Sequence, residues 1–150
     1  MSLMKALIFD GPGHMRVGER ERPVPGPGEV VVRITAAGIC GSELTSFTGE
    51  STPRAPGLVF GHELAGTVSA AADAADQSLV GMPVAINPLV PCRACRQCLA
   101  GRGNVCPNRT LLGMHLDGGF AEEVAVARAQ LRPAQRLTDI AGTLVEPMAN

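Results

Sequence analysis

The sequence predicts a small, mostly β domain: a barrel of short strands with one excursion from it. The chain has 150 residues, the size of one ordinary domain. It contains 18 glycines and 12 prolines, which favour many short strands joined by turns over a helical bundle. With 45% hydrophobic and 18% charged residues, the chain can bury a core and is not expected to be disordered.

The first half of the chain contains two expected strands separated by a loop. Residues 5–10 form a short apolar run, which we interpret as a strand. Residues 22–28 contain three prolines, which cannot lie inside a helix or a central strand, so this segment is expected to be a stiff extended loop. Residues 29–37 are rich in β-branched side chains and predict a central strand.

The second half predicts further strands and the excursion. We expect strands within residues 58–70, 80–87 and 121–127, the last after a turn signal at residues 117–119. Residues 88–107 hold four cysteines and few large apolar residues. This segment is therefore expected to leave the barrel.

Composition also excludes some classes of partner. The formal net charge is −1 without a basic run, and Phe is the only aromatic residue, so a nucleic-acid partner is not expected. No apolar run approaches membrane-spanning length, and the apolar stretch at residues 6–9 is too short for a signal peptide. Residues 1–3 are interpreted as an expression scar before a native start at Met4, so that the domain spans residues 4–150.

Five cysteines without a secretion signal indicate a cytoplasmic protein, in which clustered cysteines more often bind metal than form disulfides. Four of them have the spacing C-x2-C-x2-C-x7-C, namely Cys92, Cys95, Cys98 and Cys106. Four thiolates this close can surround one tetrahedral Zn²⁺ and leave no open position, which predicts a structural zinc lobe at about residues 88–110.

Charge supports a zinc lobe, and two alternatives stay open. A zinc ion with four thiolates carries a charge of −2, which four arginines in or beside the lobe would offset: Arg93, Arg96, Arg102 and Arg109. The cysteines could instead be buried or disulfide-bonded. An iron–sulfur cluster is the other alternative, because Cys106-Pro107 matches the end of a ferredoxin motif, although the seven-residue gap before it does not.

The remaining cysteine suggests a second site. Cys40 follows the expected strand at residues 29–37, His62 and Glu63 come a little over twenty residues later, and Glu146 precedes Pro147. Cys, His and carboxylate ligands suit Zn²⁺, and three protein ligands would leave a fourth position for water or substrate. Each residue alone has a plainer interpretation as a core cysteine, a structural histidine or a solvated turn.

Read together, these motifs resemble the zinc-containing medium-chain dehydrogenases, whose catalytic domain has a GroES-like barrel. The resemblance covers nearly all of the chain from Met4. It is carried by five segments in the family's order and spacing: Gly38-Ile39-Cys40-Gly41-Ser42-Glu43-Leu44, Gly61-His62-Glu63, the four-cysteine lobe, Asp117-Gly118-Gly119-Phe120-Ala121-Glu122 and Val145-Glu146-Pro147.

The resemblance implies roles for the residues of the second site. Cys40 and His62 would be ligands of a catalytic zinc. Both Glu63 and Glu146 match positions that serve as the remaining ligand in the polyol-dehydrogenase branch, and they would alternate. Ser42 matches the hydroxyl residue that relays the proton of the alcohol. Glu43 stands where the family usually has Asp and would accept a hydrogen bond from the ring of His62.

The resemblance also implies an activity: zinc-dependent oxidation of a small alcohol or polyol to a carbonyl, with hydride transfer to NAD or NADP. The family's Rossmann domain follows the Glu-Pro motif, and no G-x-G-x-x-G fingerprint occurs in this chain. We therefore expect the chain alone to be inactive and the complete enzyme to be a homo-oligomer. Two alternatives are a non-catalytic zinc-binding module and a zinc-free quinone or enoyl reductase relative.

Overall fold

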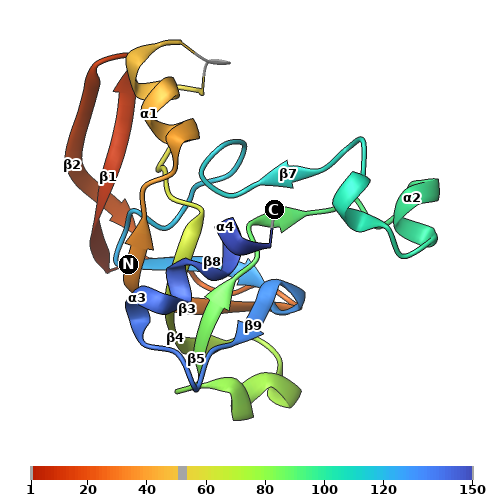
Figure 1. Cartoon of the computed structure of the whole chain (residues 1–150). Coiled ribbons are helices and arrows are strands. Elements are labelled where there is room, and N and C mark those ends of the chain that lie inside the picture. The colour runs from red at the N-terminus through yellow and green to blue at the C-terminus, as the bar shows by residue number, and fades with distance from the viewer. Residues whose placement is uncertain (1, 51–53, 150) are drawn as a thin grey trace.

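The structure is a computed structural model that describes residues 2–50 and 54–149 (Figure 1). The predicted expression scar includes Met1 and the predicted domain ends at Asn150, and both positions lie outside the described residues. The strands are β1 (Leu3–Gly11), β2 (His14–Glu21), β3 (Glu29–Gly38), β4 (Glu63–Ala71), β5 (Pro83–Ile86), β6 (Leu89–Val90), β7 (Thr110–Leu111), β8 (Glu123–Ala127) and β9 (Leu131–Pro133). The helices are α1 (Gly41–Thr48), α2 (Arg96–Leu99), α3 (Asp139–Thr143) and α4 (Val145–Met148), with 3₁₀ turns η1 (Ala74–Leu79), η2 (Gly103–Val105) and η3 (Arg128–Gln130).

A five-stranded antiparallel sheet in the order β8-β3-β4-β5-β9 forms the body of the molecule. Its two edge strands, β8 and β9, are joined by the single turn η3, which curls the sheet toward a barrel. The predicted strand at residues 29–37 is β3, and it has a partner on each side. The mostly β prediction is thus confirmed.

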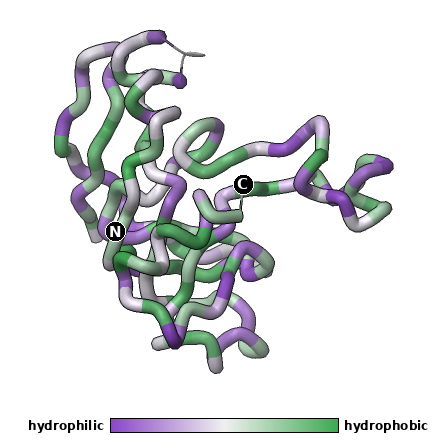
Figure 2. Tube along the Cα trace, viewed as in Figure 1, coloured by the Kyte–Doolittle hydropathy of each residue, from purple (hydrophilic) through white to green (hydrophobic). Residues whose placement is uncertain are grey.

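Apolar side chains on the inner face of this sheet make the core. Figure 2 colours much of the sheet region as hydrophobic. Val30 and Val32 alternate along β3, so both point to the same face, and each is fully buried. The core cluster consists of Val30, Val32, Leu64, Val68, Val84, Ile86, Leu112, Val124 and Val126. β3 and β4, which lead to the candidate metal ligands, are therefore fixed by apolar packing.

A hairpin of β1 and β2 adds to one end of the sheet (Figure 1). The backbone N–H of Leu7 donates to the Phe120 carbonyl at 2.7 Å, and that of Phe9 donates to the Leu58 carbonyl at 2.9 Å. The sequence did not predict β2, because its charged residues lack an alternating apolar pattern and most of them are exposed. The expected extended loop at residues 22–28 contains neither helix nor strand.

The cysteine segment leaves the body of the molecule on a two-stranded ribbon. Leu89 pairs with Leu111 and Val90 with Thr110, and the chain between them carries α2 and η2 away from the sheet (Figure 1). Between residues 91 and 109 only Cys106 is buried. The lobe therefore has almost no apolar core of its own. In the described part of the chain, no helix has the length and apolar character needed to cross a membrane.

Candidate metal centres

The lobe brings its four cysteines to one point. Their sulfur atoms all lie within 4.8 Å of one another. The Sγ of Cys92 lies 3.4 Å from that of Cys106 and 3.9 Å from that of Cys98, and the Sγ atoms of Cys95 and Cys106 are 3.8 Å apart. For Zn–S bonds of roughly 2.3 Å, the edge of a tetrahedron is about 3.8 Å. The spacing fits one zinc ion, and all four thiols are free.

The thiols of the lobe have unequal proton affinities. The backbone N–H groups of Ala94 and Cys95 lower the pKa of Cys92 to about 6, whereas burial and the Cys95 thiol raise the pKa of Cys98 to about 12. Without a cation the four sulfurs therefore cannot all ionise at neutral pH. A divalent metal would stabilise all four thiolates together, so the donor chemistry fits a structural zinc.

A second cluster lies where β3 and β4 meet. Cys40 follows the end of β3 and is the N-cap residue of α1, while His62 and Glu63 stand at the start of β4. Gly38 pairs with Glu63 across the two strands. One ligand atom each from Cys40, His62 and Glu63 lies within 4.8 Å of the other two. The antiparallel register thus brings together side chains that are more than twenty residues apart in the sequence.

Glu43 holds the two halves of this cluster in place. It is the third residue of α1, and its Oε2 accepts the backbone N–H of Cys40 at 2.9 Å, as in a capping box. Its Oε1 accepts the backbone N–H of Gly61 at 2.9 Å and lies 3.0 Å from Nδ1 of His62. The hydrogen bond to this buried carboxylate raises the pKa of His62 to about 9. The contact keeps the proton on Nδ1, so Nε2 is the ring nitrogen free to bind a metal.

Two glycines make room for the cluster. A Cβ on Gly38 would lie 2.1 Å from Oε2 of Glu63, so only glycine leaves the Glu63 carboxylate where it is. Gly61 has φ +102°, and a Cβ there would lie 2.7 Å from the backbone nitrogen of Phe120. The backbone before His62 therefore adopts a conformation and a close approach that favour glycine.

Ser42 stands in the first turn of α1, two residues after Cys40. Its Oγ accepts a hydrogen bond at 3.1 Å from Nη2 of Arg54, a residue with only 4% of its surface exposed. The sequence did not predict a role for Arg54. It lies in a Pro-rich stretch without a motif, so no signal in the sequence distinguishes it from an exposed loop arginine.

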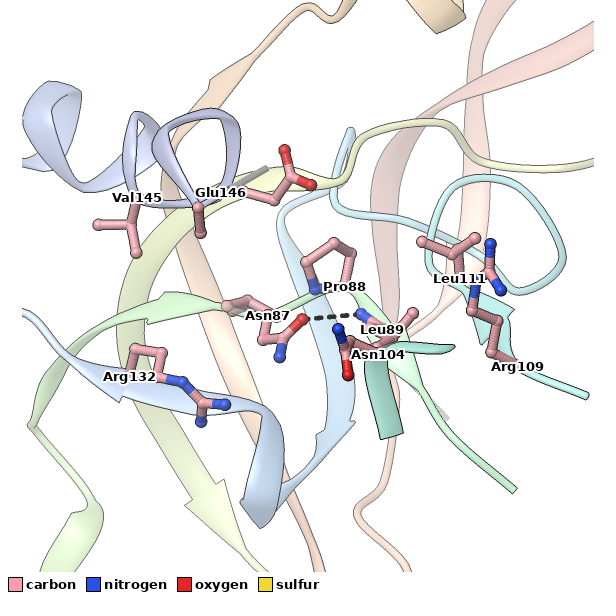
Figure 3. Close-up of a pocket in the computed structure, with 11 residues that line it drawn as sticks. Asn87, Pro88, Leu89, Asn104, Arg109, Leu111, Arg132, Val145 and Glu146 are labelled. Carbon is pink, nitrogen blue, oxygen red and sulfur yellow. Dashed lines mark hydrogen bonds between the residues drawn. The ribbon is translucent and has the colours of Figure 1, made fainter. Parts of the chain in front are cut away.

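Glu146, the remaining predicted ligand of this site, comes from a different part of the chain. It is in α4 and does not join the group of ligand atoms formed by Cys40, His62 and Glu63. Instead it lines a cavity of about 430 Å³ between α4, the end of β5 and the base of the lobe (Figure 3). Because Leu64 pairs with Ile86, the register places Asn87 of this cavity opposite Glu63. The cavity is therefore next to the cluster.

Both polar and apolar side chains line this cavity. Asn87, Asn104, Arg109 and Arg132 line it together with apolar Leu89 and Leu111 (Figure 3). The Oδ1 of Asn87 accepts the backbone N–H of Leu89 at 3.0 Å, which leaves its NH₂ group available as a donor. The sequence analysis did not predict these lining residues, because they come from β5, β9 and the lobe.

Comparison with known proteins identifies relatives over the whole chain. Residues 26–136 match the family model for the alcohol dehydrogenase GroES-like domain. L-galactonate-5-dehydrogenase of Escherichia coli K12 is 34% identical over 149 residues, which are 99% of this chain and 44% of that protein.

Solved structures agree with this match. The short chain alcohol dehydrogenase rspB of E. coli CFT073, complexed with NADH, has a TM-score of 0.90 and 35% identity over 98% of this chain and 43% of its own. A putative zinc-binding dehydrogenase of Sinorhizobium meliloti 1021, bound to NADP, has a TM-score of 0.89 and 37% identity. The match covers 99% of this chain and 44% of that protein.

The chain spans less than half the length of these relatives. Their fold covers nearly all of this chain, which confirms the predicted fold class. The family model matches more than half of the sequence, at residues 26–136. The chain therefore belongs to the alcohol dehydrogenase GroES-like domain family, the zinc-containing medium-chain alcohol and polyol dehydrogenases.

Proposed function

We propose that the chain is the metal-binding catalytic domain of an oxidoreductase that oxidises an alcohol or polyol to a carbonyl. The observation that carries the proposal is the cluster of Cys40, His62 and Glu63, whose ligand atoms lie within 4.8 Å of one another. A three-ligand set of this composition leaves an open position, whereas the four thiols of the lobe leave none. Hydride transfer itself is proposed for a whole protein of the length of the relatives.

The side chains of the cluster would divide the chemistry among them. When bound, zinc would supply a Lewis acid and a nicotinamide would supply the hydride acceptor. Cys40, His62 and Glu63 would hold the metal, and Glu43 would fix the His62 tautomer. Ser42 Oγ would accept the proton that the alcohol releases. The lobe would bind a second zinc with a structural role only.

The cavity beside Glu146 would bind the rest of the substrate. Its amide and guanidinium groups suit a molecule with several hydroxyl groups, because each hydroxyl needs a hydrogen-bond partner when it leaves water. Glu146 lies on the wall of this cavity, where it would contact the substrate or replace Glu63 as a ligand after a movement of α4. These features support a polyol over a small apolar alcohol.

Cobalt substitution tests the proposal without requiring turnover. Co²⁺ replaces zinc in such sites and absorbs visible light according to its ligands. Cobalt in the lobe would give a thiolate absorption of its own. Beyond it, we expect the cobalt-loaded chain to show a second thiolate contribution that disappears in Cys40→Ser and that changes when sorbitol is added. Equal cobalt content and equal spectra for Cys40→Ser and the parent would contradict the proposed site.

A further inference from the structure

Arg54 is a buried cation beside the proposed catalytic cluster. Its Cζ lies 4.5 Å from the centre of the Phe60 ring, and Phe60 in turn stacks on Phe9 with ring centres 4.7 Å apart. Both phenylalanines are almost fully buried, and Arg54 is 4% exposed. The Phe60 ring thus covers one face of the guanidinium group, and Phe9 packs against Phe60.

The hydrogen bonds of Arg54 leave most of its donors unused. Nη2 donates to Ser42 Oγ at 3.1 Å, while Nε and Nη1 are buried without a partner among the described residues. A buried guanidinium with unpaired donors is costly unless nearby negative charge compensates it. Burial lowers the pKa of Arg54, and the charges of Glu43 and Cys40 act in the opposite direction. Arg54 therefore interacts with the negative charge of the cluster.

The charges of the cluster indicate what this cation would do. A Cys40 thiolate and the carboxylates of Glu43 and Glu63 contribute three negative charges around a divalent ion. The sum is −1, which would disfavour a further anion at the open position. The single positive charge of Arg54 brings the sum to zero, at a place where little water screens it.

Arg54 also fixes the direction of the Ser42 hydroxyl. A serine hydroxyl has one proton and two lone pairs, and the Nη2–H of Arg54 occupies one lone pair. The second lone pair and the proton are left for other partners. Ser42 is thereby held ready to accept one proton and to donate its own.

We propose that Arg54 is a positioning residue of the cluster, which orients the Ser42 hydroxyl and makes the open metal position favour an anionic ligand over a neutral one. The inference rests on the proposed function. The proposed role explains why the charged side chain of Arg54 is buried near the cluster. An alcohol that loses its proton at this position becomes an anion, so the same preference would assist the proposed reaction.

Two small ligands of different charge test the inference. Azide and imidazole are titrated into the cobalt-loaded chain, and the parent is compared with Arg54→Gln and Arg54→Lys. We expect Arg54→Gln to weaken azide binding on the order of tenfold, since one nearby charge is lost. Imidazole binding should change by less than about twofold, because the neutral ligand has no net charge to interact with Arg54. Arg54→Lys should recover most of the azide affinity. An equal change for both ligands would indicate a merely structural arginine and would overturn the inference.

Two controls separate the possible failures. In Ser42→Ala the charge of Arg54 remains, so the preference for azide over imidazole should persist. If Arg54→Gln does not fold, the side-chain NMR signal of Arg54 in the zinc-loaded parent tests the inference instead. This signal should shift on addition of azide and not on addition of imidazole. Absence of a shift with azide would overturn the inference. If no metal site depends on Cys40, both the proposed function and the inference are overturned. If azide binds equally well with and without Arg54, the inference alone is overturned.

Discussion

The two candidate metal centres are built in opposite ways. In the lobe, four cysteines within fifteen residues supply the ligands, and Cys106 is the only buried residue between residues 91 and 109. At the junction of β3 and β4, three different donors come from separate parts of a sheet with a continuous apolar core. We therefore expect the lobe to depend on a metal in order to fold, and the second cluster to be positioned mainly by the packing of the sheet.

This difference assigns a role to each centre. A metal that replaces a hydrophobic core must have all its positions filled by protein, as four thiolates would do. A cluster held by the surrounding fold can leave one position open. Glu43 illustrates the second case, since it connects the Cys40 and Gly61 backbones and the His62 ring through protein contacts alone.

The largest effect is expected from loss of a lobe ligand. Cys106→Ser should release the lobe metal and unfold residues 91–109, because structural zinc contributes on the order of 10 kcal/mol in small zinc domains. Hydrogen exchange followed by mass spectrometry should show loss of protection in the lobe and retained protection in β3, β4 and β5. Cys40→Ser serves as the matched control. Retained protection of the lobe in Cys106→Ser would contradict its dependence on metal.

Removal of a ligand from the second cluster should have a more local effect. Cys40→Ser and His62→Gln should each lose about one zinc ion per chain and keep the fold, since the sheet core does not include these side chains. Zinc analysis combined with circular dichroism checks this. Global unfolding of either variant would show that the second metal also stabilises the barrel.

Glu43→Gln should weaken zinc binding at the second cluster and spare the lobe. Loss of a carboxylate that orients a ligating histidine typically costs about 10–100-fold in metal affinity. The amide remains close in size, so the capping contact to Cys40 should largely persist. Competition with a colorimetric chelator measures both sites, and equal weakening of the lobe would contradict the assignment.

Gly38→Ala should act on the same cluster without removing any ligand. The added Cβ would lie 2.1 Å from Oε2 of Glu63 and must displace that carboxylate. We expect zinc affinity at the second cluster to fall by about tenfold, at the lower end of the loss seen for misoriented ligands. The same chelator competition measures it. Unchanged affinity would show that Glu63 is not a ligand and would favour Glu146.

The smallest effect concerns pH in metal-free protein. The pKa of His62 is raised from its ordinary value of 6.5 to about 9, so its ion pair with Glu43 stabilises the fold fully below pH 6.5. This contribution should be lost as pH rises from 6.5 to about 9. Denaturant unfolding at several pH values should show the decline in the parent and not in Glu43→Gln. A stability that rises over this range in the parent alone would contradict the contact.

Local patterns made parts of this molecule predictable. Val-rich β3 and the short spacing of the lobe cysteines are local signals, so the strand and the cluster could be predicted from sequence. The β2 strand and helix α1 could not, because exposed charges in one and polar residues in the other give no periodic apolar pattern. The roles of the site residues were predicted only through the family resemblance, and they stay predictions.

Long-range placement explains the remaining differences. Glu63 and Glu146 are equivalent candidates in the sequence, and only the pairing of Gly38 with Glu63 places one of them beside Cys40. Arg54 contacts the Phe60 ring and the Ser42 hydroxyl, and no pattern in the local sequence predicts either contact.

Zinc content per chain tests the two-centre account most directly. The purified protein, without added metal, is measured by elemental analysis beside Cys40→Ser. The account predicts about two zinc ions in the parent and about one in the variant, since each centre would bind a single ion. About one zinc ion in both proteins, or iron in place of zinc, would contradict it.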